Sequence, residues 1–239
     1  MKKIDIDMDI LYGLYINDKM SISEIVNEIG YSKPTISRKL KEYGLTKEMQ
    51  LEQYKVNDIQ HDLIIGSILG DGSLLGNKKN KYLEISHSKT QKDYIQGKFN
   101  IIKDLCNSDV SLKTSDSYRF ITKCLPLFNR YYELSTYEIL DNLNENSLAI
   151  WLGDDGTLIK EKFYNISIAR FNQNEISYVV EVLHSKFNLN PTIKKDVTQK
   201  YGHHGISFNL YESEKLSEII KKSNLFKLLE ETLNYKLMK

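Results

Sequence analysis

The sequence predicts an α+β protein in which a small helical N-terminal unit precedes a larger unit built from two similar halves. An apolar segment that ends in an acidic residue and a glycine occurs twice, and the same order of helices and strands follows each copy. Three short amphipathic segments separated by glycines predict the N-terminal unit. We expect the helical unit in residues 1–45, a linker in 46–59, the first half in 60–143 and the second half in 144–239.

The N-terminal unit has the spacing of a helix-turn-helix. One helix is expected in IDMDILYGLYIND and a second in SISEIVNEIGY, which Ser21 or Ser23 can cap and Gly30 ends. The third, SKPTISRKLKEYGL, starts with Ser32 as its cap. This helix is expected to present polar side chains to the major groove of DNA, namely Lys33, Thr35, Arg38, Lys39 and Lys41. The segment resembles bacterial helix-turn-helix domains. The alternative is a three-helix interaction module with a basic face.

A charged linker, expected to have room for a turn of helix, leads into the first half. There LIIGSILGDGSL predicts a helix that ends near Asp71, KYLEISHS a strand and KTQKDYIQGKFNIIKDLC a helix. VSLKTS and SYRFITKC predict two more strands, and short helices continue to Leu143.

The second half repeats this order. SLAIWLGDDGTL is the second motif, FYNISIAR a strand, NQNEISYVVEVLHSKFNL a helix, and NPTIKKDV and GHHGISFNL two strands before the closing helices. A further strand beside each motif is compatible with the sequence. We therefore expect a domain with pseudo-twofold symmetry.

Small residues predict that the two motif helices pack against each other. They are spaced four apart in Gly66-x-x-x-Gly70 and in Ala149-x-x-x-Gly153, which places each pair on one helical stripe. Close packing of these stripes would bring Asp71 and Asp155 together at two helix C-termini, where negative charge is unfavourable.

Two carboxylates in such a place are a candidate metal site. Oxygen ligands suit Mg²⁺, and Mn²⁺ is expected to substitute for it. Asp155 precedes Gly156 as Asp71 precedes Gly72, so Asp155 is preferred over Asp154 as the ligand; carbonyls near Gly70 and Asp154 can add ligands. Taken alone, either motif would be an ordinary helix stop followed by a turn. A glycine-rich phosphate loop is a weaker alternative, because the G-x-x-x-x-G-K spacing is missing.

GSILGDGSL and SLAIWLGDDGTL resemble the two motifs of single-chain LAGLIDADG homing endonucleases, over roughly residues 60–239. The resemblance implies two αββαββα halves, with two curved antiparallel sheets around paired central helices. It implies that Asp71 and Asp155 are the catalytic metal ligands, one for each DNA strand, and that cleavage occurs across the minor groove with short 3′ overhangs. The ending LNYKL implies that Lys236 is a basic residue beside one scissile phosphate. The segment before the second motif offers only Arg130, which we do not assign.

The resemblance also implies that alternate residues of each sheet face DNA. On the first sheet the candidates are Lys81, Glu84, Ser86, His87, Lys113, Arg119 and Lys123. On the second sheet they are Lys162, Tyr164, Arg170, Lys194, Lys195, Lys200 and His203. The pair His203 and His204 is expected in a tip loop and not at a metal.

We therefore expect a Mg²⁺-dependent, site-specific double-strand DNA endonuclease that acts as a monomer with internal pseudo-symmetry. A non-cleaving transcription regulator, or a maturase that binds intron RNA, is the alternative. A helix-turn-helix repressor with a ligand-binding domain is a third possibility.

The composition limits the classes of protein and the cellular locations that we expect. There is no apolar run of membrane-spanning length, and two cysteines without suitably spaced histidines do not form a zinc site. Residues 76–130 hold eleven basic and five acidic side chains, which suits phosphate binding or a solvated surface. We expect a cytoplasmic protein. The Asn-, Lys- and Ile-rich usage fits an AT-rich bacterial or phage genome, and an organellar origin is also compatible.

Overall fold

The structure is a computed structural model that describes residues 6–77, 79–195 and 204–238, with Lys195 and His204 described by their backbone alone. Lys200 and His203 lie outside the described residues. Among the described helices, none combines the length and the apolarity needed to cross a membrane.

The N-terminal unit is helical, as predicted. Its helices are α1 (Met8–Tyr12), which runs into a π-helical turn (Gly13–Asn17), α2 (Ile22–Ile29) and α3 (Lys33–Glu42). Ser21 caps α2 in a reciprocal arrangement with Glu24, and Gly30 ends it with a φ of 74°. Ser32 precedes α3, but its hydroxyl bonds Thr35 and not a backbone N–H. The helices enclose a core of their own, formed by Ile6, Leu11, Tyr15, Ile16, Ile25, Ile36, Leu40 and Leu45.

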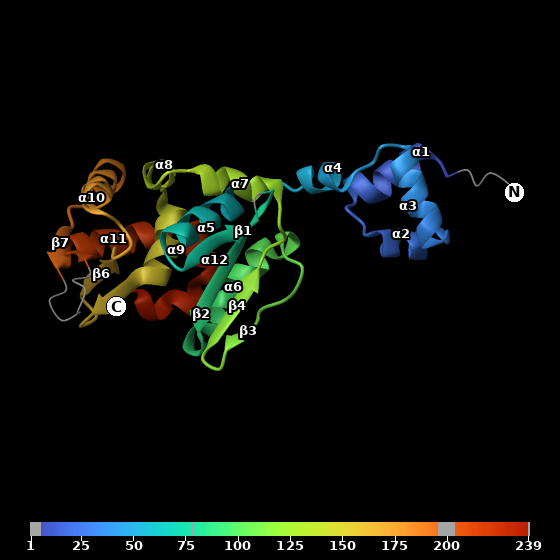
Figure 1. Cartoon of the computed structure of the whole chain (residues 1–239). Helices are drawn as coiled ribbons and strands as arrows, with labels where there is room; N and C mark the ends of the chain where they lie inside the picture. Colours follow the sequence, from blue (N-terminus) through green and yellow to red (C-terminus); the bar gives the residue numbers. More distant parts are fainter. Residues whose placement is uncertain (1–5, 78, 196–203, 239) are drawn as a thin grey trace, which may run out of the picture.

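A short helix, α4 (Lys47–Glu52), lies in the linker between the N-terminal unit and the rest of the chain (Figure 1). The amide of Gln50 donates to the carbonyls of Tyr15 and Met20, at 2.7 and 2.9 Å, which ties α4 to the N-terminal unit. Lys79 of the first half forms an ion pair with Glu48 of α4. The linker is therefore attached on both sides by side-chain contacts.

Each half carries the elements predicted from the residue pattern and, beside its motif helix, the fourth strand that the αββαββα arrangement implies. The first half comprises α5 (Asp58–Leu69), β1 (Gly72–Gly76), β2 (Lys81–Ser88), α6 (Lys92–Ile102), β3 (Ser111–Thr114), β4 (Ser117–Ile121), α7 (Pro126–Glu133) and α8 (Thr136–Asp141). The second half comprises α9 (Glu145–Asp155), β5 (Gly156–Ile159), β6 (Phe163–Ser167), α10 (Gln173–Phe187), β7 (Thr192–Lys195), β8 (His204–Ser207), α11 (Leu210–Lys222) and α12 (Asn224–Leu233). These strands are β1, which Gly70 and Asp71 separate from α5, and β5, which follows α9 directly.

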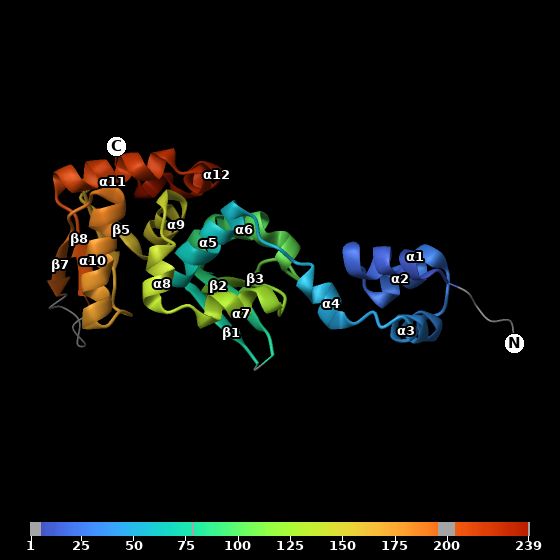
Figure 2. The same cartoon turned by 90° about the horizontal axis from the view of Figure 1, so that it is seen from above.

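The two sheets have the same topology. Their strand orders are β1-β2-β4-β3 and β5-β6-β8-β7, and every neighbouring pair is antiparallel. Gly72 pairs with Ile85 in the first sheet as Gly156 pairs with Ile166 in the second. This matched register confirms the pseudo-twofold repeat, and α5 and α9 lie side by side between the sheets (Figure 2).

The helix contact follows one of the two predicted small-residue stripes. A Cβ atom added to Gly66 would lie against the carbonyl oxygen of Ser147 and 2.6 Å from Cβ of Ile150. A Cβ atom on Gly70 would lie 2.5 Å from Cβ of Asp154. Gly153 of the second stripe instead faces the ring of Tyr94. The glycines of α5 thus allow the close approach, while the expectation that Gly153 faces α5 is wrong.

Candidate active site

The two motif helices end beside each other and bring their terminal acids together. Asp71 comes two residues after the end of α5, and Asp155 is the last residue of α9. Both acids line one pocket of about 360 Å³, whose other lining residues are Gly70, Gly72, Ser73, Ser167, Ala169 and Arg170. The structure therefore unites the two acids that the repeat singled out.

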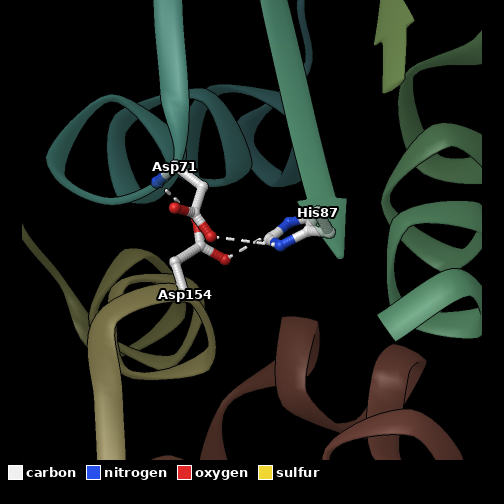
Figure 3. A group of neighbouring side chains, drawn as sticks. All are labelled: Asp71, His87 and Asp154. Atoms are coloured by element: carbon white, nitrogen blue, oxygen red, sulfur yellow. Dashed lines mark hydrogen bonds and ion pairs between the residues drawn. The ribbon is translucent and has the colours of Figure 1, made fainter. Parts of the chain in front are cut away.

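Asp154 lies in a buried cluster beside Asp71 (Figure 3). Its carboxylate oxygens accept hydrogen bonds from Lys98 Nζ at 2.6 and 2.8 Å and from the hydroxyl of Tyr94 at 2.8 Å. One of them also accepts the backbone N–H of Asp71 at 3.2 Å. His87 Nδ1 lies 3.1 Å from Asp71 Oδ2, and its Nε2 lies 3.8 Å from Asp154 Oδ1. Asp154 is thus surrounded by donors from the first half.

Asp71 and Asp155 differ in their electrostatic surroundings. Burial and the charges of Asp71 and Asp154 raise the pKa of Asp155 to about 7. Burial also disfavours the charged form of Asp71, but the contact with His87 and the charges of His87, Lys98 and Lys236 outweigh it and lower the pKa of Asp71. Near neutral pH, Asp71 is therefore ionised while Asp155 is only partly ionised.

Two sets of side chains are candidates to hold a metal ion, and they share Asp71. One ligand atom each from Asp71, His87 and Asp154 lie within 4.8 Å of one another. A cation there would compete with the ammonium group of Lys98, which already neutralises Asp154. The carboxylates of Asp71 and Asp155 line a pocket, and their mutual repulsion would be relieved by a divalent cation. Among the described residues, no lysine ammonium group contacts the acids of this second set, in contrast to Lys98 at Asp154.

Replacing Asp155 with Asn is expected to stabilise the metal-free protein at about pH 8 by about 2 kcal/mol. Each unit of pKa difference between the folded and unfolded states corresponds to about 1.4 kcal/mol of folding free energy, and this value is reduced because the carboxyl group of Asp155 is partly exposed to solvent. Because the pKa of Asp155 is raised from 3.8 to about 7 on folding, its ionisation destabilises the fold progressively across that interval. The gain should therefore shrink as the pH falls from 7 towards 4. Urea unfolding with a chelator measures it, and the exposed acid Asp109, changed to Asn, is the control. A gain independent of pH would contradict this origin.

Basic side chains bind the carbonyl ends of both motif helices. Arg170 Nη1 donates to the carbonyls of Ile68 and Gly70, at 2.6 and 2.8 Å. Lys236 Nζ donates to the carbonyl of Gly156 at 2.6 Å, and burial lowers the pKa of Lys236 although the nearby acids oppose this shift. The carbonyl of Gly70, which was predicted as a possible metal ligand, thus accepts a hydrogen bond from Arg170. Arg170 was itself predicted to face DNA.

The open face of the first sheet carries part of the predicted polar set. Glu84 forms ion pairs with Lys113 at 2.7 Å and with Arg119 at 3.2 Å. Ser86 pairs with Arg119 in the register and accepts a hydrogen bond from Lys113 at 3.4 Å. These four side chains therefore form one polar surface.

Of the three other predicted contacts of this half, Lys81 and Lys123 lie outside that surface. Lys81 Nζ lies 4.0 Å above the ring of Tyr132, and Lys123 Nζ donates to the carbonyl of Asp104 at 2.8 Å. Each lysine is held by a neighbour at the border of the sheet.

On the second sheet, Lys162 lies exposed between β5 and β6, and Lys194 is exposed on β7. The register places Asn165, Ser167 and Ser207 on the same face as Lys194. These three residues were missed at the sequence level, because short uncharged side chains in a strand give no distinctive signal.

Four residues expected at DNA are buried, and one of them is Glu84, which lies on the open face beneath its two ion pairs. His87 is only 3% exposed, on the face of β2 that packs against the helices, and Tyr164 is 1% exposed, with its hydroxyl bonded to the carbonyl of Lys236. Both follow the alternation of the strand, which places them with the core residues. Lys39 of α3 is also buried, with its ammonium group on Glu42, whereas Lys33, Arg38 and Lys41 are exposed and Thr35 is half-buried.

Lys98 and Tyr94, which contact Asp154, were also not predicted from the sequence. Both lie on α6 among the buried residues Ile95, Phe99 and Ile102. A lysine in the apolar stripe of a helix is an available signal, because a buried ammonium group requires a partner. The partner, Asp154, comes from the other half and is not apparent from local sequence.

Similar proteins were found by sequence and by structure. Probable intron-encoded endonuclease 1 of Wickerhamomyces canadensis is 25% identical over 173 residues, which are 63% of this chain and 75% of that protein. RecA of Mycolicibacterium chitae is 26% identical over 121 residues, 45% of this chain and 28% of that protein. The homing endonuclease I-WcaI, solved bound to its DNA recognition sequence, has a TM-score of 0.62 at 22% identity, with 76% of this chain and 89% of that chain covered. I-DmoI, solved with DNA and Mn, has a TM-score of 0.51 at 18% identity, with 70% and 98% covered.

These structural likenesses establish a shared fold with two sheets around paired helices. The sequence profile described as the LAGLIDADG DNA endonuclease family matches residues 61–216, which include both motifs and most of both halves. The chain therefore belongs to the LAGLIDADG DNA endonuclease family.

Proposed function

We propose that the protein is a metal-dependent, site-specific endonuclease that cuts both strands of DNA. The observation that carries this proposal is the meeting of Asp71 and Asp155 in one pocket, at the ends of two helices that lie between two equivalent sheets. Two relatives of the same fold support it, since I-WcaI is described with its DNA recognition sequence and I-DmoI with DNA and Mn.

Substrate binding would use the polar open faces of the two sheets. Lys113 and Arg119 of the first sheet are held by Glu84, which keeps two cationic groups in defined positions for phosphates or base edges. Lys194, Asn165 and Ser167 provide donors and acceptors on the second sheet. Because the two faces carry different residues, the recognised site is expected to be non-palindromic.

The acids would hold a divalent cation, and Lys236 would lie beside them. A cation bound by Asp71 and Asp155 supplies positive charge that activates water and stabilises the leaving oxygen of a phosphodiester. Asp71 is held in place by His87 and by the bond from its own backbone N–H to Asp154. Lys236, anchored on the end of α9, is placed to attract a phosphate oxygen. In the first half we propose no equivalent lysine.

The N-terminal unit would add phosphate contacts through the exposed face of α3. Changing Arg38 to Ala is expected to weaken DNA binding by about tenfold and to lower the slope of log affinity against log salt by about one. The cleavage rate of saturated complexes should stay unchanged, since α3 lies far from α5 and α9 in the fold (Figure 1). Fluorescence anisotropy at several salt concentrations measures this. Lys222, exposed on α11, gives the matched control with Lys222→Ala, and equal losses in the two variants would contradict a specific role for α3.

The proposal is tested by cleavage of the DNA that flanks the gene, joined as it would be without the insertion. The protein should cut this DNA at one site with Mg²⁺ or Mn²⁺ and should not cut it when a chelator is present. Tight binding to DNA or to the flanking RNA without cleavage in either metal would reject the endonuclease. That result would favour the alternatives, a regulator or a maturase.

A further inference from the structure

The positions directly before the two acids are occupied differently in the two halves. Gly70 precedes Asp71, and Asp154 precedes Asp155, so a glycine and an acid hold equivalent places in the repeat. The side chain of Asp154 is fully buried, whereas that of Asp71 is 39% exposed. The close approach of Asp154 to Gly70 shows that the glycine makes room for the acid of the other half.

The groups that donate hydrogen bonds to the side chain of Asp154 come from the first half. Lys98, whose side chain is also fully buried, contacts both carboxylate oxygens, and Tyr94 donates to one of them. Lys98 Nζ lies a further 3.3 Å from His87 Nε2 and 3.4 Å from Ser67 Oγ. The cluster therefore joins α9 of the second half to α5, β2 and α6 of the first.

The second half lacks an equivalent polar cluster at the matching positions. Because Gly72 pairs with Ile85 and Gly156 with Ile166, the position of His87 corresponds to Ile168. The helix caps Gln91 and Asn172 have the same offset, so Lys98 corresponds to Val179. Ile168 and Val179 are both fully buried apolar residues. The positions equivalent to His87 and Lys98 are therefore apolar in the second half, whose partner motif carries Gly70 in place of an acid.

We propose that Asp154 is the counter-ion of Lys98 and positions Asp71, and that it is not a metal ligand. The cluster reaches Asp71 at two points, through the bond from its backbone N–H to Asp154 and through His87 beside its carboxylate. Asp154 already accepts from Lys98, Tyr94 and Asp71, whereas the carboxylates of Asp71 and Asp155 line the pocket. This assignment rests on the proposed metal site at Asp71 and Asp155.

The role of Asp154 as a counter-ion can be tested separately from a role as a metal ligand. If Asp154 balances Lys98, then Asp154→Asn leaves a buried ammonium group unpaired beside Asp71, which opposes a second cation there. Removing both charges with Asp154→Asn and Lys98→Met should then restore the site, because Met fills a similar volume and Asn can still accept the N–H of Asp71. If Asp154 were a ligand, the double variant would still lack it.

The test measures Mn²⁺ binding by electron paramagnetic resonance and thermal unfolding on the full chain, for the wild type, both single variants and the double variant. Asp154→Asn should weaken Mn²⁺ binding by about tenfold or more and lower the melting temperature by about 10 °C. The double variant should bind Mn²⁺ within about threefold of the wild type and recover at least half of the lost melting temperature. If Asp154→Asn does not fold, the Mn²⁺ binding of the double variant, compared with that of the wild type, decides whether Asp154 is a ligand.

Two results would overturn the assignment. Mn²⁺ binding by the double variant that is as weak as that of Asp154→Asn would make Asp154 a ligand. Additive losses in melting temperature would show that Asp154 and Lys98 are not coupled. The variant Asp155→Asn should lose Mn²⁺ binding while Lys98 and Asp154 stay intact. It therefore tests the proposed metal site independently of the role of Asp154. A wild type that takes up no Mn²⁺ would count against the metal site, and the melting temperatures would then decide the role of Asp154 alone.

Discussion

Asp71→Asn and Asp155→Asn are each expected to abolish double-strand cleavage, with rates reduced by about a thousandfold or more. Each change keeps the size of the side chain but removes one of two carboxylates in a shared pocket, and the stabilisation that a bound cation gives to phosphodiester hydrolysis amounts to several kcal/mol. The affinity for DNA should fall little, because the sheets and α3 are untouched. Single-turnover cleavage and anisotropy, measured on the same duplex, give the two quantities.

The two variants also distinguish a shared site from two independent ones. Asp109→Asn, which removes an exposed acid from the loop before β3, is the matched control and should cut at the wild-type rate. If each acid serves one DNA strand, each variant should still cut slowly the strand that the remaining acid serves. Undiminished double-strand cleavage by either variant would show that the corresponding acid is not part of the catalytic site.

The order of the helices and strands could be predicted because it depends on local sequence patterns. The alternation in KYLEISHS and the helical spacing of Ile95, Phe99 and Ile102 survive in the structure, as does the order of elements in both halves. The strands β1 and β5 were left open, because Gly72 and Gly156 start them shortly after a helix and glycine is typical of turns. Their existence follows from pairing with β2 and β6, which is a non-local property.

The candidate site was predictable only in its outline. The resemblance and the repeat pointed to Asp71 and Asp155, but the surroundings depend on contacts far apart in the chain. Asp154 meets Lys98 across 56 residues, and Arg170 meets Gly70 across 100 residues. His87 was assigned to the wrong face of its strand, because a histidine among serines suggests a polar surface. Its burial is favourable only because two acids from different helices lie opposite it.

Gly66→Ala is expected to lower the free energy of unfolding by about 3 kcal/mol, because the added methyl group falls between two helix backbones. The obstacle includes the carbonyl oxygen of Ser147, which belongs to α9 and cannot rotate away, and Cβ of Ile150 at 2.6 Å. Relief requires that α5 and α9 move apart, which loses packing along a fully buried interface. The intrinsic preference of Ala for helices, worth about 1 kcal/mol, opposes this loss only in part.

Gly13→Ala is the matched control for this prediction. Gly13 also lies in a helical segment, and no atom lies within 4 Å of a Cβ placed there, so the change should be neutral or stabilising by up to about 1 kcal/mol. Chemical unfolding of both variants measures the difference, and the separation of the helices should also slow cleavage in Gly66→Ala by displacing Asp71 from Asp155. Equal stability of the two variants would contradict the close approach of α5 and α9, and with it the geometry that joins the two acids in one site.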